Sequence, residues 1–179
     1  MNEAVPQVET QPAPACPSPQ PVRAARTFNA KEYKLVALRE CPLPEEMDLC
    51  DEPDKAAAYW RANVTSHPAF NPDAECFVVL LLNTRRRIKG HLLVATGTLD
   101  TILVHPREVF RAAIVAAAAA VVIMHNHPSG EPQPSEADIR VTRDLIRAGQ
   151  LLKIEVLDHV IVGAGETRKS LRELGYFYS

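Results

Sequence analysis

The feature that most constrains this chain is an apolar run that ends in two histidines. The run AAIVAAAAAVVIM covers residues 112–124, and His125-Asn126-His127 follows it directly. A membrane span needs about 20 apolar residues, so this run is too short to cross a bilayer and is expected in the core of a globular domain. Its last part, AVVIM, is rich in β-branched residues and predicts a buried strand that leads the two imidazoles into a loop.

Length and charge narrow the class of protein. The chain has 179 residues, 46% of them hydrophobic and 23% charged, which is typical of a globular domain. A net charge of −2 and a pI near 6.3 provide no general basic field for nucleic acid. The four cysteines lack CxxC spacing, and the N-terminus lacks the apolar core of a signal peptide. We therefore expect a cytoplasmic protein with no membrane partner, and nucleic acid is a partner that the charge does not support.

The composition predicts one domain after a tail. Residues 1–28 are rich in Pro, Ala, Gln and Ser, and such a segment cannot bury enough surface to offset its ordering entropy. We expect a disordered tail over 1–28 and a folded domain over 29–179.

Strands and helices alternate along that domain. Strands are expected at 33–41, 75–83, 91–99, 120–124 and 154–163. Helices are expected after a cap at Asp54, from Pro106 to about Ala117, and from Ser135 to a C-terminal cap at Gly149. This interleaving predicts an α/β or α+β fold with a mixed sheet.

The two histidines have the spacing of paired ligands. Residues i and i+2 of an extended segment point to the same side, so the ring nitrogens of His125 and His127 can converge at the end of the strand. A proline-stiffened loop, 128–134, leads to Asp138 in the first turn of the next helix. Two histidines and one carboxylate are a known catalytic ligand set for zinc, with the fourth position open to water.

The segment PSEAD also fits a helix cap that needs no metal. Ser135 and Asp138 have the spacing of a capping box, in which each side chain binds the other residue's backbone N–H. We do not expect Asp138 to serve easily in both a cap and a metal site. The cap leaves His125 and His127 unexplained, whereas a metal site accounts for all three side chains, so the metal site is the favoured interpretation.

These residues resemble the core motif of the JAMM (MPN+) metallopeptidases. The order His125, any residue, His127, seven residues, Ser135, two residues and Asp138 matches H-x-H-x(7)-S-x(2)-D. The segments HPREVFRAAI, MHNHPSGEPQPSEADIRVT and LDHVIVG are similar to the RadC family, and the likeness covers roughly residues 33–179. Asn126 stands where many eukaryotic JAMM members carry Ser or Thr, which is the RadC form.

The resemblance implies both a fold and a cofactor. The fold would be of the JAMM/MPN type, which is cytidine-deaminase-like, with a curved mixed sheet flanked by helices. His125, His127 and Asp138 would hold one zinc ion, and Ser135 would help to stabilise the tetrahedral oxyanion. The implied activity is a zinc metallohydrolase that cleaves a peptide or isopeptide bond in a protein or peptide substrate.

The resemblance also implies an upstream glutamate that activates the metal-bound water and then protonates the leaving amine. Glu75 is the favoured candidate because it opens the buried strand where the family places its acid. Glu108 and Glu131 are rivals. Glu108 lies at the start of a helix, where the dipole favours an acid in any case, and Glu131 lies in the loop close to the ligands.

The remaining histidines are expected to play structural roles. His67, His91 and His105 lie in a loop or beside strands and are expected at the surface. His159, in LDHVIVG, matches the RadC pattern but lies on a separate strand. We expect it to be a satisfied structural residue rather than the partner of a ligand, although metal-bound imidazoles usually have one.

Two other functions compete with the hydrolase. RadC proteins have long carried a DNA-repair label, so the chain could be a repair-associated or DNA-contacting protein with little or no hydrolase activity. The acidic balance counts against this alternative, and so does the absence from this sequence of the helix-hairpin-helix region of fuller RadC members. A metal-free scaffold ranks last because the ligands are kept. The natural substrate and the oligomeric state cannot be predicted.

Overall fold

The computed structural model describes residues 49–97 and 104–177. The tail predicted at 1–28 and the strand expected at 33–41 lie outside these ranges, as do residues 98 and 99 of the strand expected at 91–99. The boundary near residue 28 therefore stays a prediction.

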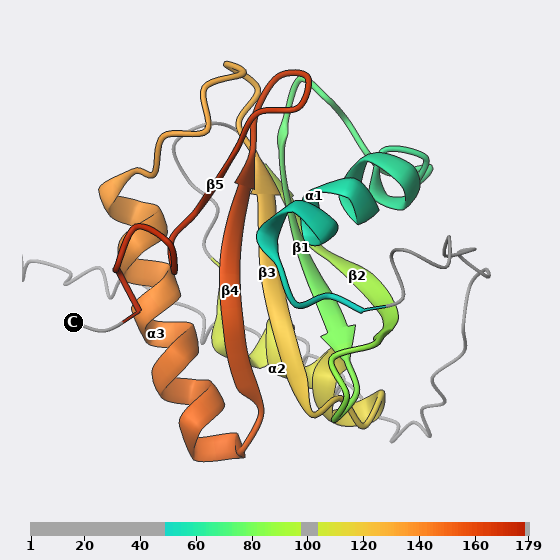
Figure 1. Ribbon diagram of the computed structural model, residues 1–179, viewed down its shortest axis with the longest axis vertical. Coiled ribbons are helices and arrows are strands. Elements are labelled where there is room, and N and C mark those ends of the chain that lie inside the picture. Colours follow the sequence, from blue (N-terminus) through green and yellow to red (C-terminus); the bar gives the residue numbers. More distant parts are fainter. Residues whose placement is uncertain (1–48, 98–103, 178–179) are drawn as a thin grey trace, which may run out of the picture. The chain divides into compact units, whose positions relative to one another are not determined.

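A five-stranded sheet forms the centre of the described fold, with the strand order β2-β1-β3-β4-β5 (Figure 1). Strands β3 and β4 pair in parallel, and the other neighbours pair antiparallel. This mixed sheet with its helices confirms the predicted fold class. The strands are β1 (Glu75–Leu82), β2 (Ile88–Gly97), β3 (Ala120–Asn126), β4 (Glu155–Val162) and β5 (Arg168–Ser170).

Helices cover both faces of this sheet. Figure 1 shows α1 in front of the strands and α2 behind them. The helices are α1 (Pro53–Tyr59), which continues as the π-helix η2 (Trp60–Val64), α2 (Pro106–Val115) and α3 (Glu136–Leu152). No helix in the described ranges combines the length and apolar character that a membrane crossing requires.

Alternate residues of the central strands supply two cores. Val78, Leu80 and Met124 pack with Tyr59 and Trp60 on the α1 face. On the other face, a second cluster joins β1 and β3 to α2 and α3 through Phe77, Val79, Ile123, Phe110 and Leu145. Because both faces are covered, β1 and β3 are apolar almost throughout and lack the alternation of a one-sided sheet.

The first helix begins before its predicted cap. Its N-cap is Glu52, and Pro53 occupies the first helical position, where the missing N–H of proline costs no hydrogen bond. The prediction of Asp54 as the cap is therefore wrong. The Asp54 carboxylate instead accepts two hydrogen bonds of 2.8 Å from the Arg168 guanidinium of β5.

The helix predicted to stop at Gly149 continues to Leu152, and Lys153 then adopts a left-handed conformation. Gly149 is buried inside this helix, at a position where no larger residue fits. A Cβ at position 149 would lie 2.5 Å from the carbonyl oxygen of Ile154 and 3.2 Å from the Phe110 ring. The glycine thus permits close packing and does not act as the predicted cap.

The other boundaries differ by small amounts. Strand β2 begins at Ile88, before the start expected at residue 91, and α2 ends at Val115 because Ala117 takes a positive φ of 47°. The antiparallel pairing of β1 with β3 sets Phe77 opposite His125, so the start of β1 meets the end of β3 at one edge of the sheet. That edge carries the candidate site.

Candidate metal centre

Four side chains converge at this edge of the sheet. Glu75 opens β1, His125 lies near the end of β3, His127 follows that strand, and Asp138 lies in the first turn of α3. Each can offer one ligand atom, and these atoms all lie within 4.8 Å of one another. The Nε2 atoms of the two histidines are 3.0 Å apart, so the i, i+2 spacing brings both rings to one point.

The distances among these atoms suit a tetrahedral ion. His125 Nε2 lies 3.3 Å from Asp138 Oδ1 and 3.5 Å from Glu75 Oε1. His127 Nε2 lies 3.6 Å from Asp138 Oδ2 and from Glu75 Oε1. Ligands bonded to zinc at about 2.0–2.2 Å in a tetrahedron are separated by about 3.4 Å. The donor set therefore fits zinc in both chemistry and spacing.

The protonation of His127 supports this fit. Its Nδ1 lies 2.7 Å from the backbone carbonyl of Glu131 and must donate there, because a carbonyl oxygen can only accept. Its Nε2 is then the atom available to a metal. Two unprotonated Nε2 atoms 3.0 Å apart repel each other unless a proton or a cation is shared between them.

Asp138 belongs both to the helix cap and to the ligand cluster. Its Oδ2 accepts a hydrogen bond of 2.7 Å from the backbone N–H of Ser135, which completes a capping box, while its Oδ1 faces His125. The expectation that this carboxylate does not easily serve both roles is therefore wrong. A carboxylate has two oxygens with about four lone-pair sites, enough for both.

Ser135 lies beside the cluster and directly supports one of the candidate ligands, Asp138. Its hydroxyl donates to Asp138 Oδ2 at 2.7 Å and accepts from the Asp138 backbone N–H at 3.2 Å. In this arrangement the hydroxyl proton is directed to Asp138. The predicted oxyanion role would require the hydroxyl to turn towards substrate, and that role stays a prediction.

The pKa values of the two carboxyl groups in the cluster, Glu75 and Asp138, are shifted in opposite directions. Burial raises the pKa of Glu75, and the nearby charge of Asp138 raises it further. Burial also opposes ionisation of Asp138, but its interactions with His127, His125 and Ser135 hold its pKa well below the usual range. Such a divergence is typical of a permanently ionised ligand beside a group that can carry a proton.

Neither rival glutamate belongs to the described cluster. The Glu108 carboxylate pairs with Arg111 at 3.0 Å within α2. Glu131 contacts His127 through its backbone carbonyl, and the residue is exposed. Among the three candidates, only Glu75 lies within reach of the imidazoles.

Asn126, between the two histidines, fixes the backbone on both sides of Glu75. Its Oδ1 accepts a hydrogen bond of 2.9 Å from the N–H of Cys76, and its Nδ2 donates to the carbonyl of Ala74 at 3.0 Å. The sequence identified Asn126 only as the RadC form of the motif. A buried polar residue at the end of an apolar strand was the available signal that it has partners.

His159 contacts a candidate ligand directly, so the expectation that it is not a ligand's partner is wrong. Its Nε2 lies 2.8 Å from His125 Nδ1, and its Nδ1 lies 2.6 Å from the hydroxyl of Thr142. The parallel pairing of β3 with β4 sets His159 opposite Ile123, next to His125 along the sheet. Thr142, which the sequence analysis missed, lies one helical turn after Asp138 and on the same face of α3.

The other histidines lie outside the cluster. His105 is exposed, as expected, and precedes α2. His67 and His91 are only partly exposed, and His91 Nδ1 lies 2.8 Å from the Tyr59 hydroxyl.

The loop that carries His127 is anchored to the turn between β4 and β5. The N–H of His127 donates to the carbonyl of Val162 at 3.1 Å, and the N–H of Ala164 donates to the carbonyl of Gly130 at 2.9 Å. Gly163 permits this approach, because a Cβ there would lie 2.4 Å from the Gly130 carbonyl oxygen.

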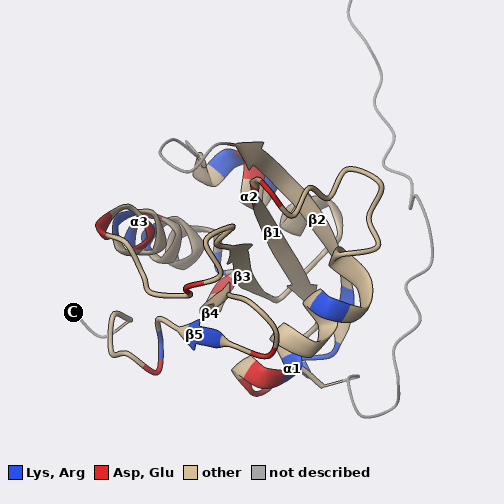
Figure 2. Cartoon of the chain, turned by 90° about the horizontal axis from the view of Figure 1, so that it is seen from above, with Lys and Arg blue, Asp and Glu red and all other residues tan. Residues whose placement is uncertain are grey.

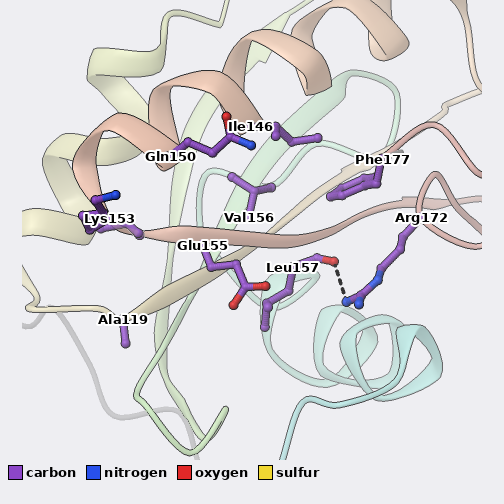
Figure 3. Close-up of a pocket in the computed structure, with 11 residues that line it drawn as sticks. Ala119, Ile146, Gln150, Lys153, Glu155, Val156, Leu157, Arg172 and Phe177 are labelled. Atoms are coloured by element: carbon purple, nitrogen blue, oxygen red, sulfur yellow. Dashed lines mark hydrogen bonds between the residues drawn. The ribbon is translucent and has the colours of Figure 1, made fainter. Parts of the chain in front are cut away.

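The hollow drawn in Figure 3 is separate from this centre. It measures about 570 Å³ and lies between α3 and the start of β4, where Ile146, Val156 and Phe177 form part of its wall. None of the four cluster residues lines it. The hollow therefore provides no wall for a substrate at the candidate centre.

Comparison with known proteins places these features in a family context. The model of the RadC-like JAB domain family matches residues 50–176. A UPF0758 protein of Thermosynechococcus vestitus is 43% identical over 131 residues, which cover 73% of this chain and 50% of that relative. A UPF0758 protein of Rubrobacter xylanophilus is 55% identical over 95 residues, covering 53% of this chain and 42% of that relative.

A third relative gives the same picture. A UPF0758 protein of Caldanaerobacter subterraneus is 48% identical over 103 residues, which cover 58% of this chain and 44% of the relative. The chain spans about half the length of the curated relatives it matches.

Proposed function

Because this chain belongs to the RadC-like JAB domain family, we propose that it is a zinc-dependent metallohydrolase that cleaves a peptide or isopeptide bond. The observation that carries the proposal is the convergence of His125, His127 and Asp138, whose facing nitrogen and oxygen atoms lie 3.0–3.6 Å apart, with the Glu75 carboxylate 3.5 Å from His125 Nε2 and 3.6 Å from His127 Nε2. His125, His127 and Asp138 would hold the zinc. When bound, zinc lowers the pKa of a coordinated water to about 7 and polarises a carbonyl oxygen.

Glu75 is proposed to move the proton. Its carboxylate would accept a proton from the attacking water at Oε1 and then deliver that proton to the leaving amine nitrogen. The raised pKa of Glu75 suits both steps, because the group can be protonated and deprotonated closer to neutral pH than an ordinary glutamate. The partly accessible side chains of Glu75, His127 and Asp138, with 12–14% exposure, leave a route for a substrate.

Ser135 is proposed to assist at the oxyanion. Its hydroxyl, which donates to Asp138 Oδ2 at 2.7 Å, would turn to donate to the developing negative oxygen. Removal of the hydroxyl would then lower turnover and also weaken the support of Asp138.

The charge distribution favours a protein substrate over DNA. Figure 2 shows acidic residues beside the basic ones on α1 and α3. Together with the net charge of −2, this mixture offers little attraction for a phosphate backbone.

We further propose a reducing compartment such as the cytoplasm, which the free buried thiols of Cys50 and Cys76 support.

Metal analysis of the purified protein tests the proposal. We expect about one zinc per chain in the wild type and almost none in His127→Ala, with the exposed His105→Ala as a matched control that retains zinc. Glu75→Gln should keep zinc and lose hydrolysis of a fluorescence-quenched peptide library. A wild type that binds no zinc contradicts the proposal, and loss of zinc from Glu75→Gln would instead make Glu75 a ligand.

A further inference from the structure

Three hydrogen bonds connect the helix of Asp138 to the ring of His125. The Thr142 hydroxyl lies 2.6 Å from the backbone carbonyl oxygen of Asp138 and 2.6 Å from His159 Nδ1. His159 Nε2 lies 2.8 Å from His125 Nδ1. Thr142, His159 and His125 are at most 1% exposed, so water does not compete for these bonds.

The chemistry of the groups gives these bonds one direction. The Thr142 hydroxyl has one proton and must donate it to Asp138, because a carbonyl oxygen can only accept. The hydroxyl oxygen then accepts from His159 Nδ1–H. A neutral imidazole carries one proton, so His159 Nε2 is bare and accepts from His125 Nδ1–H.

The series of hydrogen bonds ends at His125, whose other ring nitrogen faces the ligand cluster. With its proton on Nδ1, neutral His125 has an unprotonated Nε2, the atom that lies 3.0 Å from His127 Nε2 and 3.3 Å from Asp138 Oδ1. The Phe77 ring stacks on His125 at 6.1 Å with an interplanar angle of 8°, which closes one side of this buried network. The Asp138 carbonyl at the start of this chain of hydrogen bonds thus sets the proton positions as far as His125 Nε2.

We infer that Thr142 and His159 are positioning residues, which fix the tautomer of His125 so that its Nε2 is free to bind metal. This inference rests on the proposed metal site and deepens it. The chain of hydrogen bonds through Thr142 and His159, which we call the relay, starts at the backbone of Asp138 and ends at His125. It therefore connects two proposed ligands that come from different elements, α3 and β3. A shift of α3 would disturb both ligands together.

The relay also differs from the more usual support of a metal-bound histidine by a carboxylate or a backbone carbonyl. A carboxylate partner would add a negative charge beside His125 and make it a more basic ligand. The His159 imidazole accepts the same hydrogen bond without that charge. His159 therefore orients the His125 ring without adding a negative charge, and Asp138 and Glu75 are the only carboxyl groups in the described cluster.

Two substitutions of one residue separate the relay from ordinary packing. Thr142→Val keeps the shape of the side chain but removes the hydroxyl, whereas Thr142→Ser keeps the hydroxyl and removes a methyl group. In Thr142→Val, His159 loses the acceptor for Nδ1–H, so its proton can move to Nε2 and force the His125 proton onto Nε2. We expect zinc affinity, measured by chelator competition, to fall about 10–100-fold in Thr142→Val and to remain near wild type in Thr142→Ser.

Imidazole ¹⁵N NMR of the metal-free protein tests the tautomers without any activity or metal. We expect His159 to be protonated at Nδ1 in the wild type and in Thr142→Ser, and at Nε2 in Thr142→Val. Wild-type His159 protonated at Nε2 would overturn the inference, even if Thr142→Val failed to fold. Equal zinc affinities of the valine and serine variants would also overturn it. Absence of zinc binding in the wild type would refute the proposed function, while the NMR result would still decide the relay.

Discussion

The side chain of Asn126 accepts a hydrogen bond of 2.9 Å from the backbone N–H of Cys76, a contact that joins the end of β3 to the start of β1. The same side chain donates to the carbonyl of Ala74 at 3.0 Å. Asn126 thus holds the residues immediately before and after Glu75, and the Glu75 carboxylate reaches the imidazoles from a fixed backbone. The residue between the two histidines thus positions the proposed base, whereas the histidines themselves are the proposed zinc ligands.

Asn126→Ala should therefore reduce turnover more than it reduces zinc binding. A displacement of about 1 Å at a catalytic group can cost about 100-fold in rate, and we expect a loss of this order in peptide hydrolysis. The buried groups left unpaired should also lower the free energy of unfolding by roughly 1–3 kcal/mol. Zinc content, turnover and urea denaturation measure the three effects separately.

Asn83→Ala provides a matched control. The Asn83 side chain likewise makes two hydrogen bonds with the backbone, but in the turn between β1 and β2, where it accepts from the N–H groups of Arg85 at 2.8 Å and Arg87 at 3.0 Å. Its removal should lower stability without a specific effect on hydrolysis. If both variants lose turnover only in proportion to their stability, the positioning role of Asn126 is wrong.

Removal of metal should lower the stability of the folded domain. A ligand that binds only the native state adds about 2.7 kcal/mol at a concentration of 100 times its dissociation constant. We expect a chelator to lower the melting temperature of the wild type and added zinc to restore it. His127→Ala should show neither change, whereas a response equal to that of the wild type would place the bound zinc elsewhere.

The burial of Asp158 predicts a pH dependence of folding stability that does not involve the proposed metal ligands. Burial raises its pKa above 3.8, although hydrogen bonds from Ser170, Arg172 and His159 oppose the shift. The folded state therefore holds this proton more tightly than the unfolded state does. The stabilisation from this proton is present at low pH and is lost as the pH rises from about 3.8 through the raised pKa.

Asp158→Asn removes this titration. We expect the stability of the variant relative to the wild type to increase as the pH rises from the acid range towards neutrality, in denaturant melts with zinc absent. Asp73→Asn, which replaces an exposed carboxylate in the loop before β1, is the control for the change of charge alone. A relative stability that falls with rising pH would show that the hydrogen bonds to the ionised form outweigh burial.

The candidate ligands could be identified from the sequence because the geometry that brings them together is local. The spacing of His125 and His127 acts within one extended segment, and Asp138 lies at a helix start that Ser135 marks. The buried strand that begins with Glu75 was visible as a continuous apolar run. These features need only the periodicity of single elements.

The supporting residues depend on how the elements pair, which no local pattern records. A register shift in β4 places Val121 opposite Val156 but Val122 opposite Asp158, so Leu157 is an extra residue in that strand. Such a bulge changes which side chains face each side of the sheet, and simple alternation cannot assign His159 to the ligand side. Thr142 was missed for the same reason, since its role depends on His159.

Gly163 shows how strongly the position of His127 depends on another part of the chain. A methyl group there would lie 2.4 Å from the Gly130 carbonyl oxygen, 2.5 Å from the Thr167 hydroxyl and 2.8 Å from the ring of Pro132. Gly163→Ala must therefore push the loop that follows β3 and carries His127 away from the turn between β4 and β5. Since that loop carries His127, we expect lower zinc affinity together with a loss of roughly 1–3 kcal/mol in stability from overpacking.

Gly165→Asn is the control for this substitution, because it changes a glycine in the same turn without a clash. A Cβ at position 165 would meet no atom within 4 Å, and asparagine tolerates the left-handed φ of 58°. The asparagine variant should bind zinc like the wild type, whereas the alanine variant should bind more weakly in the same chelator competition. Wild-type affinity in Gly163→Ala would mean that the loop can shift while His127 stays in place, and that the close contact at Gly163 serves stability alone.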